Sequence, residues 1–152
     1  MRPLHITALL VLLADQISKL VVVEWLNLKV LGEIEVLSPY LDFRMAWNTG
    51  INFGILQTSR WVLIAVALAI IIWVYLWVRK EGARPIGMVS AGVLIGGALG
   101  NVVDRIRYGA VADFLNVSCC GFENPYSFNI ADISIFVGAF GLILFTGEKK
   151  TP

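Results

Sequence analysis

The chain has 152 residues, of which 58% are hydrophobic and only 15% are charged, and its mean hydropathy is +0.78. Soluble globular domains are nearer to half apolar and a quarter charged, so this composition indicates one membrane-embedded domain, residues 1–152. The formal net charge of +1 leaves neither a basic surface nor an acidic tail, and we expect no nucleic-acid partner.

Four apolar segments are each long enough to cross a hydrocarbon core, which takes about 20 helical residues. They cover roughly residues 4–25, 61–78, 86–104 and 129–145. We therefore expect an all-α membrane protein with four transmembrane helices. The first segment carries Asp15, Gln16 and Lys19 and lacks a small-residue cleavage site, so we expect it to stay in the protein rather than be removed as a signal peptide.

Basic residues set the expected orientation, because short cytoplasmic loops carry an excess of Lys and Arg. Tight basic clusters precede the first segment, fill the turn between the second and third, and follow the fourth. They are Arg2, Arg79, Lys80, Arg84, Lys149 and Lys150. Basic residues on the opposite side are nearly as numerous, but they are dispersed in two longer loops among acids. We expect both termini to lie in the cytoplasm.

The loop between the first two segments, residues 26–60, then falls on the outer side. Residues 29–37 and 41–47 alternate partly between apolar and polar, as half-buried strands do. We expect a small strand-rich extracytoplasmic flap on the outer membrane face, with Trp47 and Phe53 at headgroup level.

The third segment carries Gly92, Gly96 and Gly100, each four residues from the next. Residues four apart share a helix face, so this glycine stripe allows a neighbouring helix to approach closely. No Gly-Lys-Ser/Thr follows it, which excludes a phosphate loop. We interpret the stripe as a packing feature of the bundle.

Ionisable residues are expensive in hydrocarbon, so acids at the edges of apolar segments indicate a functional site. With the expected topology, four distant stretches bring polar residues to a similar depth near the outer face. These residues are Asp15, Lys19, Asn101, Asp104, Arg105, Asp113, Asn129 and Asp132. Asp113 and Asp132 have no basic residue within four positions, so no local partner offsets their charge.

Structural roles are the alternatives for the other polar residues. Asp15 and Lys19 share a helix face and are placed for a buried ion pair that fixes helix register. Asn129 is suited to cap the fourth helix. Asp104 and Arg105 are suited to form an interfacial salt bridge at the end of the third. None of these alternatives explains the remaining two aspartates.

Several chemistries are excluded by composition. The only histidine, His5, lies at the expected cytoplasmic end of the first helix, which rules out a Ser-His-Asp triad, a Cys-His pair or a His-based zinc site near the outer face. Cys119 and Cys120 are adjacent, a poor spacing for a structural disulfide, and we interpret them as loop thiols. Carboxylate chemistry remains, in which one acid of a close pair keeps a proton while the other activates water.

Five blocks of residues occur in a fixed order along nearly the whole chain. They are residues 15–19 (DQISK), 48–54 (NTGINFG), 96–105 (GGALGNVVDR), 111–114 (VADF) and 128–132 (FNIAD). Each block alone is weakly specific, but the set resembles the lipoprotein signal peptidases (signal peptidase II) of bacteria. Asn52 departs from the pattern of that family, which usually has a small residue there.

The resemblance implies an aspartyl endopeptidase of the bacterial inner membrane, with its active site near the outer face. Its substrates would be diacylglyceryl-modified prolipoproteins, cleaved so that the lipidated cysteine becomes the new N-terminus. The resemblance puts the catalytic dyad at Asp113 and Asp132, with no metal and no other cofactor. Site-supporting or substrate-binding roles fall to Asp15, Lys19, Asn48, Gly50, Asn101, Asp104, Arg105 and Asn129. Membrane lipids and inhibitory cyclic peptide antibiotics are the other partners it implies.

Two other classes of function remain open from the residues alone. One is a small proton-coupled carrier in which Asp15, Lys19, Asp104 and Asp132 form a relay. It predicts polar residues spread through the membrane depth, whereas most of those here lie near one face. The other is an assembly factor that packs on partners through the glycine stripe, and it leaves the paired aspartates unexplained.

Overall fold

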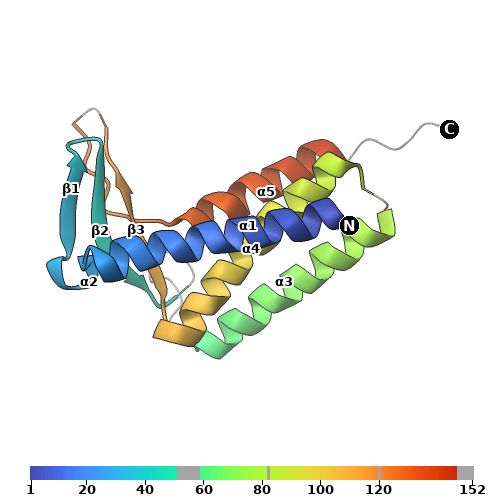
Figure 1. Cartoon of the computed structure of the whole chain (residues 1–152), viewed down its shortest axis with the longest axis horizontal. Coiled ribbons are helices and arrows are strands. Elements are labelled where there is room, and N and C mark those ends of the chain that lie inside the picture. The colour runs from blue at the N-terminus through green and yellow to red at the C-terminus, as the bar shows by residue number, and fades with distance from the viewer. Residues whose placement is uncertain (51–58, 82, 120, 147–152) are drawn as a thin grey trace.

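A computed structural model of the chain describes residues 1–50, 59–81, 83–119 and 121–146. Long helices form a bundle, and a small sheet closes one end of it (Figure 1). The long helical elements are α1 (Arg2–Lys19), which continues as the π-helical η1 (Leu20–Trp25), α3 (Arg60–Glu81), α4 (Pro85–Tyr108) and α5 (Ile130–Thr146). The remaining elements are the single-turn α2 (Leu28–Leu31) and the strands β1 (Glu33–Leu37), β2 (Leu41–Asn48) and β3 (Val111–Val117).

Three helical stretches of the described residues are long and apolar enough to cross a membrane, namely Arg2–Trp25, Arg60–Glu81 and Pro85–Tyr108. They match the first three expected segments to within a few residues. The fourth expected segment corresponds to α5, an apolar helix of 17 residues. That length is slightly below the roughly 20 residues of a straight crossing, so a fourth crossing stays a prediction.

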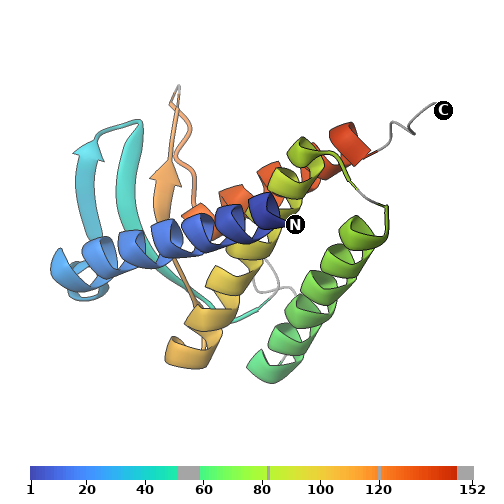
Figure 2. The same cartoon turned by 45° about the vertical axis from the view of Figure 1, so that its right-hand side comes forward.

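The central helix is α4, which packs against α1, α3 and α5, while α3 stands apart from α1 (Figure 2). A Cβ added to Gly92, Gly96 or Gly100 would lie 2.5 Å from an atom of α1 in each case. Side chains larger than hydrogen are therefore excluded along this face of α4. The prediction that the glycine stripe permits close helix packing is confirmed.

The outer faces of the bundle are strongly apolar. Trp61 on α3 is 60% exposed and Phe136 on α5 is 75% exposed, and many aliphatic side chains on the same helices are also exposed. A soluble monomer rarely exposes such continuous apolar surface. The helices thus present the surface that a lipid environment favours.

The sheet is antiparallel with the order β1-β2-β3. Strands β1 and β2 lie in the loop between the first two spans, as expected, whereas β3 comes from the connection between α4 and α5 and was not predicted. The first part of the expected strand 29–37 is wrong, because α2 covers Leu28–Leu31. The turn of α2 buries Leu28 completely, against Val22 and Val23 of η1 and Phe114 of β3.

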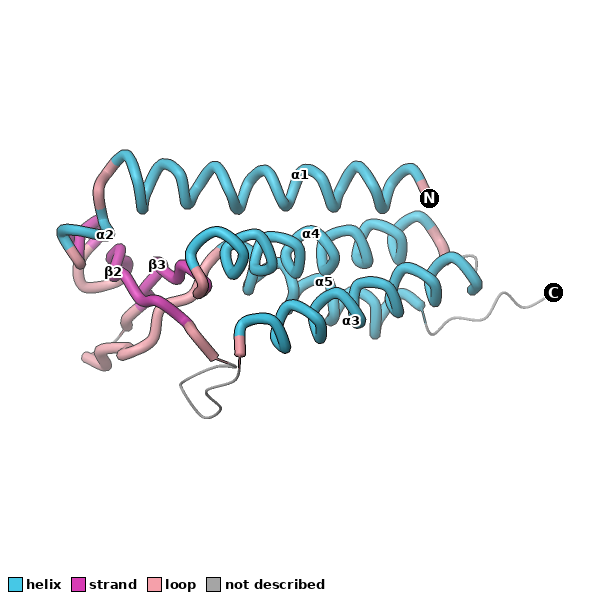
Figure 3. The backbone as a smooth tube through the Cα atoms, turned by 90° about the horizontal axis from the view of Figure 1, so that it is seen from below, coloured by secondary structure: helices cyan, strands magenta, loops and turns pink. Residues whose placement is uncertain are grey.

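The apolar cluster that Leu28 forms with Val22, Val23 and Phe114 packs β3 against η1. The rings of Phe43 on β2 and Phe114 on β3 pack edge to face with centroids 5.8 Å apart. Seen from below, the sheet lies at the end of the bundle opposite to the N-terminus (Figure 3). Strand β3 therefore carries its central residues to the mouth of the helix bundle.

Candidate active site

The two aspartates without local partners come together at the mouth of the bundle. Asp113 lies on β3 and is 3% exposed, while Asp132 lies in the first turn of α5. Asp113 accepts hydrogen bonds from Asn48 Nδ2 at 3.2 Å and from Asn129 Nδ2 at 2.6 Å. Asp132 accepts one from Asn101 Nδ2 at 2.9 Å. Three amides from three separate elements of the chain therefore hold the carboxyl pair.

Asn129 joins the two aspartates. Its Oδ1 accepts the backbone N–H of Asp132 at 2.8 Å, and its own N–H donates to Asp132 Oδ2 at 3.3 Å. This reciprocal pattern is that of a capping box at the start of α5. Asn129 is therefore the helix cap expected from the sequence, and the same amide binds Asp113.

Burial, together with the nearby charge of Asp132, raises the pKa of Asp113 to about 7. The hydrogen bonds from Asn48 and Asn129 and the charge of Lys19 oppose this shift. Near neutral pH a substantial fraction of Asp113 thus keeps its proton. A carboxyl pair that holds one proton has both an acid and a base available for hydrolysis.

The carboxyl pair opens onto a cavity of about 1030 Å³. Its polar end is formed by the sheet and the start of α5, and its apolar end lies between α3 and α5. The polar lining includes Asn48, Thr49, Gly50, Asn101, Arg105, Asp113 and Asp132, and the apolar lining includes Leu63, Val66, Ile70, Ile135, Phe136 and Ala139. A peptide with an apolar segment next to its reactive bond would match this division.

Arg105 lines the same cavity, and its N–H donors are only partly satisfied by hydrogen bonds. Its Nη2 lies 3.4 Å from the carbonyl oxygen of Gly50 and its Nη1 lies 3.4 Å from that of Asn101, both long for hydrogen bonds. Its buried Nε has no hydrogen-bond partner in the described part of the chain. The guanidinium is thus placed to bind a carbonyl or another oxygen entering the cavity.

Asp15, Lys19 and Asp104 also come together, but behind the carboxyl pair. Lys19 Nζ lies 2.8 Å from Asp15 Oδ2 and 2.7 Å from Asp104 Oδ2. The expected ion pair within α1 is confirmed. The salt bridge suggested between Asp104 and its chain neighbour Arg105 is wrong, because α1 packs closely on the glycine stripe of α4 and brings Lys19 to Asp104.

Gln16 was missed as a candidate, although it lies inside the first sequence block. Its amide donates to Asp15 Oδ2 at 3.0 Å and to Asp104 Oδ1 at 3.1 Å. An uncharged side chain gives no signal in a search for ionisable groups. Its position between two acids on different helices is visible only once the helices are packed.

Two remaining expectations concern loops. Cys119 is disulfide-bonded, so its interpretation as a free loop thiol is wrong. Spacing along the chain does not fix the local backbone geometry that decides whether a disulfide closes. Asn52, Phe53 and Cys120 lie outside the described residues. Within the described ranges, no three His, Cys, Asp or Glu side chains converge as metal ligands would.

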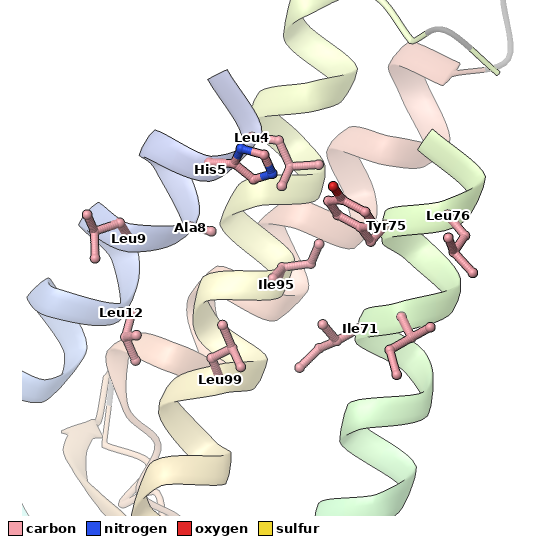
Figure 4. Close-up of a pocket in the computed structure, with 11 residues that line it drawn as sticks. Leu4, His5, Ala8, Leu9, Leu12, Ile71, Tyr75, Leu76, Ile95 and Leu99 are labelled. Carbon is pink, nitrogen blue, oxygen red and sulfur yellow. The ribbon is translucent and has the colours of Figure 1, made fainter. Parts of the chain in front are cut away.

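A second cavity, of about 380 Å³, lies between α1, α3 and α4 (Figure 4). Its lining is aliphatic apart from His5 and Tyr75, whose rings stack with centroids 5.9 Å apart. No carboxyl group lines it among the described residues. The carboxyl pair and its polar cavity are therefore the candidate active site.

An amide-bound pair of aspartates at the mouth of an apolar helix bundle is the arrangement expected of an aspartic peptidase that works in a membrane. The family model described as signal peptidase (SPase) II matches residues 7–147. The chain belongs to this family.

Relatives support the same assignment. The lipoprotein signal peptidase of Methylorubrum extorquens (strain PA1) is 43% identical over 145 residues, which cover 90% of this chain and 81% of the relative. That of Caulobacter vibrioides is 41% identical over 142 residues, covering 90% and 82%. That of Halothermothrix orenii is 35% identical over 146 residues, covering 96% of each chain.

Solved structures of a bacterial membrane enzyme have the same fold. One, determined at 2.3 Å resolution, has a TM-score of 0.79 and 27% identity, and the match covers 97% of this chain and 92% of the other. Another, at 1.9 Å, has a TM-score of 0.80 and 28% identity, with 96% and 92% covered. The resemblance drawn from the five sequence blocks is confirmed: the chain is an aspartic-type peptidase, a hydrolase. The carrier alternative has no support.

Proposed function

We propose that this protein cleaves the signal peptide from diacylglyceryl-modified prolipoproteins, with Asp113 and Asp132 as its catalytic dyad. The observation that carries the proposal is that Asn129 binds both carboxyls, that of Asp113 through its Nδ2 and that of Asp132 through its backbone N–H, at the polar end of a cavity with an apolar extension. Membership of the signal peptidase II family, whose relatives are named lipoprotein signal peptidases, supports the same reaction.

The chemistry follows from a dyad that holds one proton. The ionised carboxylate takes a proton from a water molecule, whose oxygen attacks the carbonyl carbon of the scissile bond. The protonated carboxyl gives its proton to the carbonyl oxygen, so no full negative charge develops there. Collapse of the tetrahedral intermediate breaks the C–N bond; the departing nitrogen of the lipidated cysteine takes the proton that the first carboxylate received from water, and a hydroxyl of the intermediate returns a proton to the other carboxylate. The raised pKa of Asp113 favours Asp113 as the proton donor at neutral pH.

Supporting roles follow from the contacts around the dyad. Asn48, Asn101 and Asn129 bind its carboxyls, and Arg105 and Gly50 offer polar groups to the substrate backbone. The apolar end of the cavity suits the signal peptide and the acyl chains of the substrate. The same cavity is the proposed binding site for inhibitory cyclic peptides, and membrane lipids surround the bundle.

The membrane placement is also a proposal. We infer four crossings by a single domain of the bacterial inner membrane, both termini in the cytoplasm, and the dyad and sheet at the outer face. The basic residues Arg79, Lys80 and Arg84 at the turn between α3 and α4, away from the sheet, support this orientation. Exposed Trp25 and Trp61, at the sheet end of η1 and of α3, suit an outer interfacial belt.

The direct test uses the purified protein in detergent and a diacylglyceryl-modified prolipoprotein, with cleavage followed by gel shift. Asp113→Asn and Asp132→Asn should each lower the cleavage rate at least about 10³-fold, because each removes a group that exchanges protons with water or substrate. Asp42→Asn is the matched control, since Asp42 lies on β2 and bonds the backbone N–H of Val36 instead of facing the cavity. It should leave the rate unchanged.

Two outcomes contradict the proposal. Substantial cleavage by either folded dyad variant would remove that aspartate from the catalytic role. Failure of folded wild-type protein to cleave the lipid-modified substrate would reject the reaction itself.

A further inference from the structure

A buried ion cluster lies directly behind the proposed dyad. It consists of Asp15, Gln16 and Lys19 on α1 and Asp104 on α4, and its three charged residues are 0%, 2% and 1% exposed. The single ammonium of Lys19 binds both carboxylates, and the amide of Gln16 binds both as well. Burying three charges costs several kcal/mol per ion in desolvation, so such a cluster is weak evidence for a role in stability alone.

Each carboxylate of the ion cluster also binds the backbone immediately before a dyad aspartate. Asp104 Oδ2 accepts the N–H of Ala112 at 3.1 Å, and Ala112 precedes Asp113. Asp15 Oδ1 accepts the N–H of Ala131 at 3.0 Å, and Ala131 precedes Asp132. The two dyad segments, from β3 and α5, are thus both tied to carboxylates that share one ammonium.

The position of each alanine explains why its backbone N–H is available to a carboxylate of the ion cluster. The N–H of Ala131 is in the first turn of α5, where backbone donors have no partner within the helix. The N–H of Ala112 bonds Asp104 instead of the neighbouring strand β2. Both alanines are fully buried, so water does not compete for either donor. A change in the ion cluster therefore acts on the backbone that carries the dyad.

The ion cluster itself does not face the substrate. Among the described residues that line the dyad cavity, none belongs to the cluster. Gly100 separates it from the cavity side of α4 without a side chain of its own, and a Cβ there would lie 2.5 Å from Asp15 Oδ2. An effect of these residues on the reaction has to pass through position, not through contact with substrate.

We propose that the ion cluster is a positioning device, which sets the separation of the two dyad carboxyls through the backbone N–H groups of Ala112 and Ala131. This role rests on the proposed function and deepens it. Asp15, Lys19 and Asp104 are positioning residues, and Gln16 is a fourth. Catalytic groups have to be held within about 0.5 Å of the productive geometry, and a misplacement of about 1 Å is able to cost about 10²-fold in rate.

The test measures kcat and KM separately for Asp104→Asn, Lys19→Met and Gln16→Ala on the diacylglyceryl-modified prolipoprotein. We expect kcat to fall about 10- to 100-fold in the two charge variants and severalfold in Gln16→Ala, with KM within about twofold of wild type. Lys29→Met is the matched control. It makes the same substitution in the surface ion pair of Lys29 with Glu24, and should leave both constants unchanged.

A double variant separates positioning from a general packing role. Gln16→Ala combined with Asp104→Asn should lower kcat less than the product of the two single losses, because both act on one link to Ala112. Lys19→Met leaves two buried carboxylates without their cation and is the variant most exposed to misfolding. Gln16→Ala keeps every charge, so it decides the question if Lys19→Met does not fold.

Unchanged kcat in folded Gln16→Ala and Asp104→Asn would overturn the proposal, as would a raised KM with unchanged kcat, since that marks substrate contact. A loss of kcat that only tracks a lower melting temperature would also overturn it. Failure of the proposed function is recognised separately, because Asp113→Asn then stays active. If Asp113→Asn is inactive and the cluster variants are fully active, only the positioning role fails.

Discussion

Two pairs of aspartates lie next to each other in this protein, all of them buried except the half-buried Asp132, and the pairs differ in what binds them. Asp15 and Asp104 share the ammonium of Lys19. Asp113 and Asp132 are bound by asparagine amides, which donate hydrogen bonds without bringing a compensating charge. A cation next to a carboxylate favours its ionised form, whereas burial among neutral groups favours the protonated form.

The comparison separates a scaffold from a reactive site. A carboxylate held by an ammonium is a fixed acceptor, and in the ion cluster it is used to hold backbone N–H groups. Burial and the nearby charge of Asp132 raise the pKa of Asp113 to about 7 despite the hydrogen bonds from two amides, so that this carboxyl can give and take a proton near neutral pH. The pair that shares a lysine ammonium thus holds the backbone, and the pair without an ammonium of its own is available for chemistry.

Among changes to the groups that bind the two pairs, the largest expected effect comes from removing the Asn129 amide that binds Asp113. Asn129→Ser keeps an oxygen that is able to cap α5 but loses the Nδ2 donor to Asp113. We expect the cleavage rate to fall about 10²-fold while the melting temperature stays near that of wild type. Asn129→Ala should lose the same activity and also about 1 kcal/mol of stability, because the cap is gone.

Wild-type activity in Asn129→Ser would show that the cap, and not the amide, is the contribution of this residue. A melting temperature equally low in both variants would show that the serine does not cap, and the rate of the serine variant would then reflect lost stability.

The next largest effect comes from placing an ammonium next to the reactive pair, as Lys19 lies next to Asp15 and Asp104. Asn48→Lys puts an ammonium where the amide now donates to Asp113, and this charge should lower the pKa of Asp113 by about 1–3 units. The proton needed at neutral pH is then lost, so activity at pH 7 should fall about 10-fold or more. The pH optimum of kcat should move to lower pH by a similar interval.

The control for this prediction is Asn48→Leu. The hydrogen bond from Asn48 opposes the raised pKa of Asp113, so its removal should move the optimum to higher pH, in the opposite direction and by less. Shifts of the two variants in the same direction would contradict the electrostatic account of the site.

Much of this site is recognisable in the sequence, since Asp113 and Asp132 are acids without a basic residue within four positions and lie in motif-like blocks. What the sequence does not reveal is pairing between distant segments. Lys19 binds Asp104 across the interface of α1 and α4, and the adjacent Arg105 is a misleading candidate partner. Packing, not spacing, decides between such partners.

The spans and the sheet also differ in how far the sequence predicts them. Long apolar runs predict helices directly, and three of the four expected spans meet the length for a crossing. Strand β3 is not evident from the sequence, because residues 111–114 are buried on both faces and show no alternation. The strand becomes evident only from its pairing with β2, a contact with a distant part of the chain.

The smallest expected effect is on stability, and it tests whether folding raises the pKa of Asp113. The pKa of Asp113 is raised from 3.8 to about 7 on folding, so the folded state binds its proton more tightly than the unfolded state. The stabilisation that this proton provides is complete below pH 3.8 and is lost progressively as the pH rises to about 7. Asn does not ionise, and Asp113→Asn escapes this loss. Its melting temperature relative to wild type should therefore be higher at pH 8 than at pH 5, by on the order of a few degrees. Asp42→Asn, on the same sheet but outside the pair, should show no such dependence. An equal difference at both pH values for Asp113→Asn would mean that this carboxyl titrates normally, and the contrast between the two aspartate pairs would lose its electrostatic basis.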